Sequence, residues 1–526
     1  MKYSMLRNSR KILAAIVLIL SLLIFLQGGR LAVALSRPVL FWQFVPSAVK
    51  FILNAGGIAA LGFLLIVLLT LLFGRIYCAC LCPLGVLQDS FSLFRRKPRR
   101  YTYLAPRPKL RYGLIALVSL TTIAGSLGLL NLLDPYSLFG RIGRQIFKPL
   151  VILGNNLLAS MLGRFDIYTV PRLVLPQFFL ALFVMTLGMF GLLFWLAWRY
   201  GRQYCNTLCP VGTVLGVLSR FSLYQIRLSA EKCTACMRCE RLCRAGCIDS
   251  RHKTLDASRC VACFDCLTVC PVAALTYDPM LPHRTTAAVN ASRRKFLVTS
   301  ISSIGAILLA GLPLRSLAKT FLSWEQSVLT QADPLRDNII PIVPPGAGSI
   351  TRFAASCTGC HLCVSVCPTH VLQFTGRKYG FQGVLQPTLD YQSGYCDYEC
   401  TACGQVCPTG AIDLLRLNVK QRVQIGTVKL ITDRCIVYDR KEECGACMEV
   451  CPTHAVHAVE LDGLQHPQIK TEHCIGCGRC EYVCPVTPTA IFVEGMREHA
   501  QALPPLYIEP PQAAPRMQED SDDFPF

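Results

Sequence analysis

Four stretches of the chain are apolar and almost free of charge over about the length of a membrane-spanning helix. They cover Ile12–Leu26 (with an extension toward Leu35), Phe51–Phe73, Tyr112–Leu133 and Pro176–Trp198. A hydrocarbon core about 30 Å thick is crossed by roughly 20 helical residues. The pattern therefore predicts a four-helix membrane unit over residues 1–222 rather than the buried helices of a soluble protein.

Lysines and arginines cluster beside particular ends of these stretches. They precede the first stretch at 2–11, separate the second from the third at 95–111, and follow the fourth at 199–202. Because cytoplasmic loops carry an excess of Lys and Arg, we expect these loops to be cytoplasmic and the loop 134–175 to be outside. Within that loop, Ile146–Leu162 is expected to lie on the membrane surface as an amphipathic helix.

The membrane unit contains an internal repeat. Residues 73–85 read FGRIYCACLCPLG and residues 200–212 read YGRQYCNTLCPVG, so eight of thirteen positions match. Two copies of one unit are expected to pack about a pseudo-two-fold axis, which would bring together four cysteines: Cys78, Cys82, Cys205 and Cys209. Four thiolates could hold a metal ion or a cluster, or form two redox dithiols, and small packing residues are the other interpretation. Cys80 is replaced by Thr207 in the second copy and is left out.

Two cysteine runs follow the membrane unit, within residues 223–282. They are Cys233, Cys236, Cys239 and Cys243, and then Cys260, Cys263, Cys266 and Cys270. This is the spacing of two-cluster ferredoxins, in which each run gives three ligands to one [4Fe–4S] cluster and the fourth to the other. The first run has Arg244 where the others have proline, and Cys247 follows four residues after Cys243. Either cysteine could be the fourth ligand, and the spacing favours Cys243.

Four more runs of the same kind lie in the C-terminal half. They are Cys357, Cys360, Cys363 and Cys367; Cys396, Cys400, Cys403 and Cys407; Cys435, Cys444, Cys447 and Cys451; and Cys474, Cys477, Cys480 and Cys484. Adjacent runs are expected to pair, with a nested pairing left open. The runs assign 24 of the 30 cysteines to six [4Fe–4S] clusters. Structural zinc sites favour two separated pairs instead, and the haem-like Cys357–His361 segment continues at ferredoxin spacing.

We predict an export signal between the two cysteine-rich regions, at residues 290–318. Arg293 and Arg294 open a basic, then apolar, then small-residue pattern that ends at Ala318. The paired arginines indicate the twin-arginine route, with a fifth membrane helix as the alternative and cleavage after Ala318 left open. Both interpretations place residues 319–500 in the periplasm as a four-cluster ferredoxin, followed by a disordered tail at 501–526.

The charge of the chain supports this topology. Only 16% of the residues are charged, against about 25% in soluble domains. The net charge of +21 divides into +27 for residues 1–300 and −6 for residues 301–526. Because the positive charge accompanies the apolar stretches, it indicates membrane topology and excludes nucleic acid as the partner.

Together these features resemble a pair of known proteins. Residues 1–280 resemble NapH-type membrane polyferredoxins, and residues 290–500 resemble the twin-arginine-exported NapG/MauM type. The membrane unit is also similar to NosR-type and CcoG-type proteins. The resemblance implies a multi-domain fold, with a duplicated four-helix transmembrane unit and bacterial-ferredoxin-like α+β domains, in the inner (cytoplasmic) membrane.

The resemblance also implies a function as a quinol dehydrogenase component. Electrons would pass from the quinone pool through the clusters to a periplasmic reductase or cytochrome. Asp134, Tyr136 and Arg141, at the outer end of the third stretch, are the candidates for a quinol site, although helix capping and anchoring would equally explain them. The alternative function is a redox or copper-handling assembly factor for a periplasmic or membrane metalloenzyme.

Overall fold

The computed structural model describes the chain with several gaps. The described residues are 2–27, 29–53, 58–92, 101–173, 180–279, 340–374, 379, 383 and 385–506. The predicted export signal at 290–318 and residues 507–526 of the predicted tail lie outside them.

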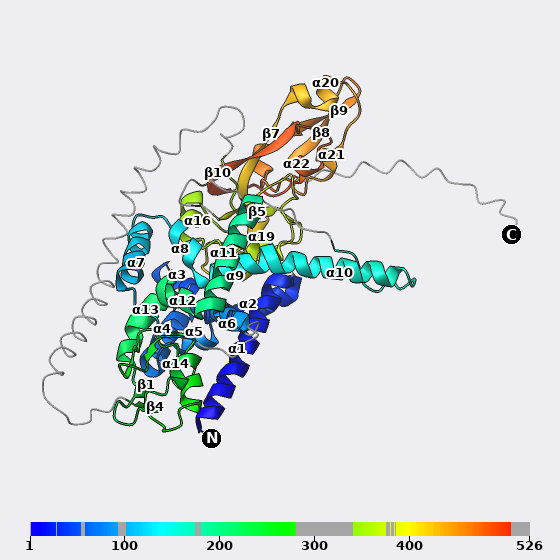
Figure 1. Ribbon diagram of the computed structural model, residues 1–526. Coiled ribbons are helices and arrows are strands. Elements are labelled where there is room, and N and C mark those ends of the chain that lie inside the picture. The colour runs from blue at the N-terminus through cyan, green and yellow to red at the C-terminus, as the bar shows by residue number, and fades with distance from the viewer. Residues whose placement is uncertain are drawn as a thin grey trace.

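Helices make up the described part of the first 221 residues (Figure 1). They are α1 (Lys2–Leu26), α2 (Gly29–Phe41), α3 (Phe44–Leu53), α4 (Ile58–Phe73), α5 (Ile76–Cys80), α6 (Pro83–Phe91), α7 (Pro108–Ile123), α8 (Gly128–Leu133), α9 (Pro135–Ile142), the π-helical turn η2 (Gly143–Phe147), α10 (Lys148–Gly163), α11 (Leu180–Tyr200), α12 (Gln203–Thr207), α13 (Pro210–Leu218) and the 3-10 turn η3 (Ser219–Phe221). Among the described residues, three helical segments are long and apolar enough to cross a membrane: Tyr3–Leu26, Pro135–Gly163 and Leu180–Tyr200. A bent pair, Leu31–Phe41 and Phe44–Ile52, would make a fourth span.

Two of the four predicted spans are not single helices. The stretch Phe51–Phe73 is divided between the end of α3 and the 16-residue α4. In the stretch Tyr112–Leu133, α7 ends at Ile123 and α8 starts at Gly128 after a turn at Gly125, where φ is +86°. Glycine adopts this left-handed conformation without steric cost, so the chain leaves the helix there. Apolar character alone did not reveal this break.

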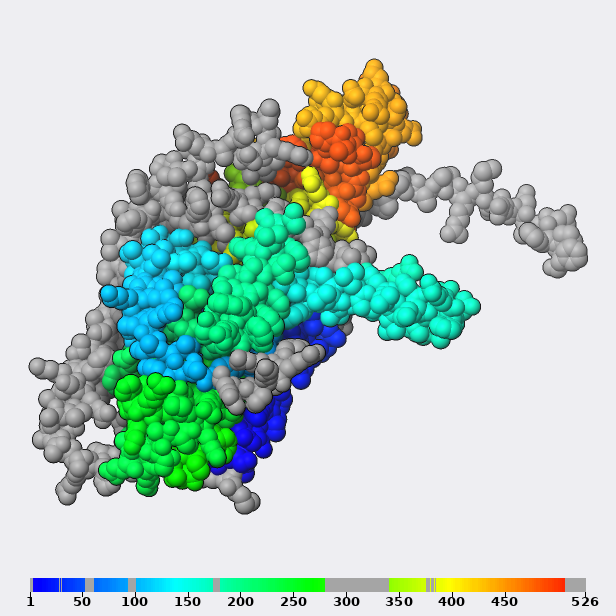
Figure 2. Space-filling view, in the orientation of Figure 1, coloured from blue at the N-terminus to red at the C-terminus, as the bar shows by residue number. Residues whose placement is uncertain are grey.

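The predicted surface helix forms, but as part of a longer helical segment. Figure 2 shows α10 protruding from the body of the molecule. Leu150, Leu157 and Met161 are exposed on one side of it. On the other side, Asn155 and Asn156 are hydrogen-bonded to the loop that follows. An apolar side left open in this way suits contact with lipid.

A first cysteine-rich unit, residues 224–279, packs at one end of the helices. Its elements are β1 (Tyr224–Leu228), α14 (Arg238–Leu242), β2 (Ile248–Asp249), β3 (Thr254–Leu255), η4 (Asp265–Thr268) and β4 (Leu275–Pro279). β1 pairs with β4 and β2 with β3, both antiparallel. The ends of the unit are therefore held together by β1 and β4.

A second cysteine-rich unit, residues 340–506, lies at the opposite end of the helices (Figure 1). Its elements are α16 (Ile350–Ser356), α17 (Leu362–Val366), β5 (Leu372–Phe374), β6 (Pro387–Leu389), α18 (Ala402–Val406), α19 (Leu417–Lys420), β7 (Val423–Leu430), η5 (Thr432–Arg434), α20 (Ile436–Asp439), α21 (Ala446–Glu449), β8 (Val456–Leu461), β9 (Leu464–Ile469), η6 (Thr471–His473), α22 (Arg479–Val483) and β10 (Ile491–Gln501). The antiparallel pairs are β5 with β6, β7 with β10, and β8 with β9. The unit continues to Leu506, whose N–H donates to the Thr453 carbonyl at 3.0 Å. This contact joins residues beyond the predicted boundary at 500 to the unit.

One apolar core joins all three parts. Phe25 and Phe139 of the helices belong to the same buried cluster as Phe264 of the first unit and Leu362 of the second unit. Both cysteine-rich units are therefore packed directly against the helices, at opposite ends.

Candidate iron–sulfur centres and membrane cysteines

The cysteines of the second unit form four groups, each with three members from one run and one from its neighbour. Electrostatic interactions place Cys407 with Cys357, Cys360 and Cys363, and Cys367 with Cys396, Cys400 and Cys403. They likewise place Cys451 with Cys474, Cys477 and Cys480, and Cys484 with Cys435, Cys444 and Cys447. Adjacent runs thus exchange their fourth cysteines, which is the arrangement of two-cluster ferredoxins.

The first unit has the same exchange. Cys270 lies with Cys233 and Cys239, whose run includes the exposed Cys236. Cys243 lies with Cys263 and Cys266, in the run that starts at Cys260. Cys247 lies 3.5 Å from Cys243, sulfur to sulfur, and also interacts with Cys260. The hydrogen bond from Cys247 lowers the pKa of Cys243 to about 7, which favours the thiolate at this position.

The loops between cysteines turn in a regular way. In four runs, the second and fourth residues after the first cysteine have positive φ: Ala235 and Met237, Ala262 and Phe264, Gly359 and His361, Gly476 and Gly478. Such turns let one short loop direct three cysteine side chains to the same side. Backbone N–H groups then donate to sulfur, for example from Gly476 to Cys474 at 3.3 Å. Hydrogen bonds of this kind are one of the means by which proteins set cluster potentials.

The residues fit [4Fe–4S] clusters better than single metal ions. Cys435, Cys444, Cys447 and Cys484 together line one hollow. Among the described residues, no three His, Cys, Asp or Glu side chains converge closely enough to hold one metal ion. His361 is not positioned as a haem ligand, because it is buried and its Nε2 lies 2.8 Å from the Leu385 carbonyl oxygen. Burial lowers the pKa of His361 to about 4, which keeps its ring neutral.

The structure brings the four repeated membrane cysteines together. Cys205 and Cys209 interact electrostatically with Cys78 and Cys82, and each of the four is at most 5% exposed. We call Cys78, Cys82, Cys205 and Cys209 the membrane quartet. Cys80 is also buried and lies instead near Arg10, Arg202 and Asp89.

Two buried arginines cross between the repeats. Arg75 donates to the Cys205 carbonyl at 3.2 Å and lies 3.8 Å from the Cys78 sulfur. Arg202, its counterpart in the second copy, donates to the Cys78 carbonyl. Each copy therefore fixes the first cysteine loop of the other, and the two guanidinium groups place positive charge beside the thiols. The sequence analysis missed both arginines, although the Gly-Arg pair is present in both copies of the repeat.

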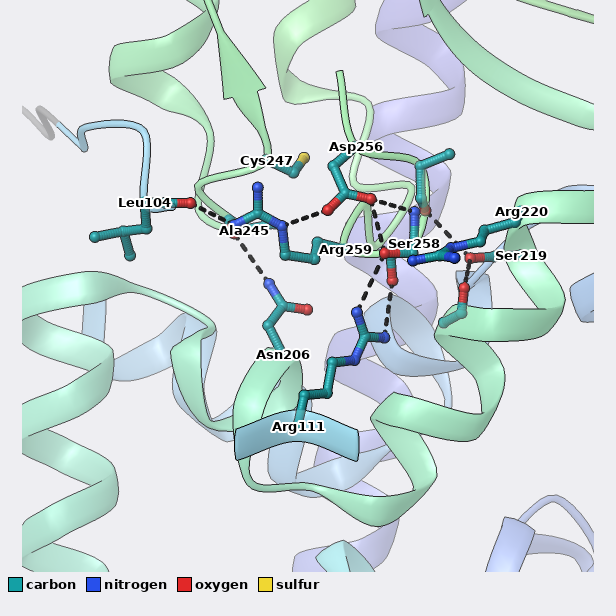
Figure 3. Close-up of polar contacts among 12 residues, drawn as sticks. Leu104, Arg111, Asn206, Ser219, Arg220, Ala245, Cys247, Asp256, Ser258 and Arg259 are labelled. Atoms are coloured by element: carbon teal, nitrogen blue, oxygen red, sulfur yellow. Dashed lines mark hydrogen bonds and ion pairs between the residues drawn. The ribbon is translucent and has the colours of Figure 1, made fainter. Parts of the chain in front are cut away.

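The helices of the first 221 residues and the first unit meet in a dense polar interface. Arg75 reaches the Ser258 carbonyl at 3.0 Å, two residues before Cys260. Figure 3 shows Arg111 directed at Ser258, and Asn206 bonded to the Ala245 carbonyl at 3.0 Å. These contacts fix the first unit to both repeats.

Arg244, which replaces the usual proline, takes part in this interface. It pairs with Asp89 of α6 at 3.0 Å and with Asp265 of the first unit at 3.4 Å. Asp89 also pairs with Arg202 at 2.7 Å and with Arg10 at 3.5 Å. The departure from the ferredoxin pattern at Arg244 is therefore a contact between the first unit and the membrane helices.

The candidates Asp134, Tyr136 and Arg141 lie where the second unit meets the helices. Arg141 donates to the Gly359 carbonyl at 3.5 Å, next to Cys360, and Asn131 donates to the Cys357 carbonyl at 3.3 Å. Asp134 caps α9 through Ser137 at 2.7 Å. Among the described residues, Oδ1 of Asp134 and the hydroxyl of Tyr136 have no hydrogen-bond partner, although both residues are buried.

Comparison with known proteins finds two iron–sulfur domain families in the chain. Residues 55–101 and 182–228, which contain the two repeats, match the 4Fe-4S binding domain family. Residues 356–411 and 417–487, which contain the paired runs of the second unit, match the 4Fe-4S dicluster domain family. The chain is a ferredoxin-type iron–sulfur protein.

Three relatives illustrate the similarity. The chain is 29% identical to the ferredoxin-type protein NapF of Escherichia coli O157:H7 over 159 residues, which are 30% of the chain and 87% of NapF. It is 29% identical to the methylamine utilization ferredoxin-type protein MauM of Methylorubrum extorquens over 210 residues, 38% of the chain and 88% of MauM. It is 26% identical to an uncharacterized protein of Methanocaldococcus jannaschii over 178 residues, 34% of the chain. It spans about half of that protein, 54%. No solved structure matches.

The comparisons and the helices establish a coarse description. The chain is an iron–sulfur electron-transfer protein related to NapF, NapG, MauM and MauN proteins. It carries multiple [4Fe–4S] clusters and has three to four helices that are apolar enough to span a membrane.

Proposed function

We propose that the protein oxidises quinol at the membrane and passes the electrons through its second unit to a periplasmic reductase. The observation that carries the proposal is the contact between the Cys360 loop and the buried residues Asp134, Tyr136 and Arg141. If these three residues form the quinol site, that site lies beside the first cysteine group of the second unit. The reductase is the partner that the resemblance to NapG/MauM-type proteins implies, and the chain is similar to the ferredoxin-type proteins NapF and NapG.

The six cysteine groups are the proposed cluster sites, with Cys243 as the fourth ligand of its group. In the second unit, the group that contains Cys360 contacts the helices. The group of Cys396 is next, and the N–H of Cys396 donates to the Cys477 carbonyl at 2.8 Å, which links it to the third group. The last group lies beside α20, far from the helices (Figure 1). This order leads electrons away from the membrane toward a soluble partner.

The quinol site would use the unpartnered polar atoms at this contact. A quinol hydroxyl could donate to Oδ1 of Asp134 and accept from the hydroxyl of Tyr136. Buried polar atoms without partners are costly, so a bound hydroxyl would satisfy both. Oxidation of one quinol to quinone releases two protons and two electrons, and the Asp134 carboxylate would take up the protons in turn and release them to solvent. A [4Fe–4S] cluster held by Cys357, Cys360, Cys363 and Cys407 would accept the electrons one at a time.

The membrane quartet is proposed to hold a further [4Fe–4S] cluster. Chains of hydrogen bonds lead from the quartet toward the first cysteine-rich unit and toward the second. Arg75 links Cys205 to Ser258 beside Cys260, and the Tyr204 hydroxyl donates to the Leu133 carbonyl at 2.9 Å. Arg141 donates hydrogen bonds to the carbonyl of Leu132 and to the carbonyl of Gly359, which precedes Cys360. The quartet therefore lies between the two cysteine-rich units, and we propose that it connects them electronically.

The alternative as a copper-handling assembly factor is less well supported. The four cysteines of the quartet are each at most 5% exposed, and Arg75 and Arg202 are hydrogen-bonded to their loops, which suits a centre that stays in place. The described residues also show no convergence of ligands for a single ion. Both observations favour a resident redox centre over a transfer site.

Quinol-driven reduction in anaerobic membranes tests the proposed site. Duroquinol should bleach the cluster absorbance, and Tyr136→Phe and Asp134→Asn should slow the bleaching while dithionite still reduces every cluster. Tyr168→Phe, at a side chain 79% exposed on the loop after α10, is the matched control. Unchanged quinol rates in both variants would exclude this location.

A further inference from the structure

A hollow lies where the first unit meets the start of α7. Four arginines line it (Arg107, Arg111, Arg220 and Arg259), and Asp256 is the only carboxylate in its lining. Figure 3 shows three of these arginines, Arg111, Arg220 and Arg259, around Ser258. The hollow therefore has an excess of positive charge that the protein does not balance.

Two of these arginines are buried and have unused donors. Arg111 and Arg259 are 6% and 5% exposed. Arg111 donates through its terminal nitrogens to Ser258, but its Nε has no partner among the described residues. Arg259 is bonded to Asp256 and Leu104, and its Nη2 likewise has no partner there. A buried donor without an acceptor is costly, which points to an absent acceptor of negative charge.

Guanidinium groups bind phosphate oxygens well, because their paired N–H groups match two oxygens at once. The exposed rim supplies two more cations, Arg107 and Arg220, and Arg220 is bonded to the Tyr112 hydroxyl at 3.1 Å. The site is thus built for a phosphate monoanion or a larger phosphate-bearing group.

The position of the hollow selects the source of the phosphate. It opens at the N-terminal end of α7, whose leucines Leu110, Leu117 and Leu120 are 45%, 49% and 65% exposed. A phosphate in the hollow would have an uncovered apolar helix face beside it, as a lipid headgroup does. Basic pockets between membrane helices on the cytoplasmic side are known to accept anionic headgroups.

We propose that this hollow binds the phosphate of an anionic phospholipid, with the acyl chains along α7. The bound lipid would join α7, α12 and the loop of Asp256, because residues of all three line the hollow. It would thereby hold the first cysteine-rich unit against the membrane helices. The proposal does not depend on quinol oxidation.

The test compares lipids on the purified full-length protein. Cardiolipin or phosphatidylglycerol should raise its thermal unfolding midpoint and remain bound through gel filtration, whereas phosphatidylcholine should do neither. The double variant Arg107→Gln/Arg220→Gln removes the exposed rim without touching the buried pair, and it should lose the shift. Arg199→Gln, a basic residue at the end of α11, is the control and should keep it.

Three results would overturn the proposal. The first is an equal shift with phosphatidylcholine, and the second is an undiminished shift in the double variant. The third is a full shift with inorganic phosphate alone, which would assign the hollow to free phosphate instead of lipid.

Discussion

At the scale of single residues, Gly140 shows how closely the second unit approaches the helices. A Cβ at this position would lie 2.4 Å from the Cys360 carbonyl oxygen and 2.8 Å from the ring of Phe25. Atoms this close must move apart, and neither neighbour is the free end of a flexible side chain. The contact that carries the proposed function therefore depends on glycine.

Gly140→Val is expected to loosen the second unit from the helices. Amide hydrogen exchange of the Cys357–Ser365 segment should rise, because its carbonyls would lose Asn131, Arg141 and Lys148 as donors. Gly154→Val in α10, where nothing lies within 4 Å, is the matched control. Equal exchange in the two variants would contradict the docked arrangement.

His499 should make the second unit sensitive to acid. Burial lowers its pKa from an ordinary 6.5 to about 4, and neither ring nitrogen has a partner among the described residues. The unfolded chain takes up a proton near pH 6.5, whereas the folded chain does so only near pH 4. The stabilisation is therefore complete above pH 6.5 and is lost as the pH falls toward 4.

His499→Phe should flatten this part of the pH dependence, measured as the unfolding midpoint between pH 7 and pH 5. His473→Gln is the comparison, because the His473 ring already lies 2.6 Å from the Pro504 carbonyl oxygen. If the unfolding midpoint of His499→Phe changes with pH as steeply as that of the wild type, another group causes the acid sensitivity.

For single residues, the sequence predicted the cysteine groups but not the residues that pack beside them. The spacing of the runs is visible because cluster loops demand it. Arg75 and Arg202 were missed because a basic residue at the end of an apolar stretch is ordinarily explained by topology. Their burial against Cys205 and Cys78 depends on the packing of two repeats, which no local pattern contains.

At the scale of elements, the membrane helices are less regular than the apolar pattern predicts. The pattern located the apolar stretches but not their breaks, since Gly125 interrupts a stretch that is equally apolar on both sides. The apolar pattern also did not show that Pro135–Gly163 is one continuous helical segment. This segment begins at a proline and includes a π-helical turn. Periodicity and length are weak guides where every face can contact lipid.

The interface between α6 and the first unit makes a direct prediction. Arg244→Met would remove two buried ion pairs, with Asp89 and Asp265, and breaking a buried pair costs up to about 3–5 kcal/mol. In this variant the first unit should lose its clusters at a lower temperature than in the wild type. The loss is measured as the decrease in cluster absorbance on heating. Arg251→Met, at an exposed position of the same unit, should have no effect. Equal loss in both would mean that the ion pairs do not hold the interface.

At the scale of the whole molecule, two cysteine-rich units lie at opposite ends of one helical body (Figure 1). Charge and topology arguments predicted opposite sides of the membrane, but sequence could not indicate that both units dock on the helices. Docking includes side-chain contacts to backbone carbonyls, such as those of Gly359 and Ser258, which leave no trace in composition or periodicity.

If the membrane quartet connects the two units, electrons should cross the bilayer. Liposomes containing the protein and trapped ferricyanide should reduce the ferricyanide when dithionite is added outside. In the double variant Cys78→Ser/Cys205→Ser, the rate of ferricyanide reduction should fall to that of protein-free liposomes, while both units keep their iron. Cys80→Ser, on the same helix as Cys78, is the control. A wild-type rate in the double variant would remove the quartet from the path.

The proposed function depends on electrons that enter the protein from quinol. The most direct measurement is low-temperature electron paramagnetic resonance of the purified full-length protein, mixed anaerobically with duroquinol. The account predicts signals of reduced [4Fe–4S] clusters at a level that is a substantial part of the dithionite signal. Clusters that dithionite reduces but duroquinol leaves fully oxidised would contradict it.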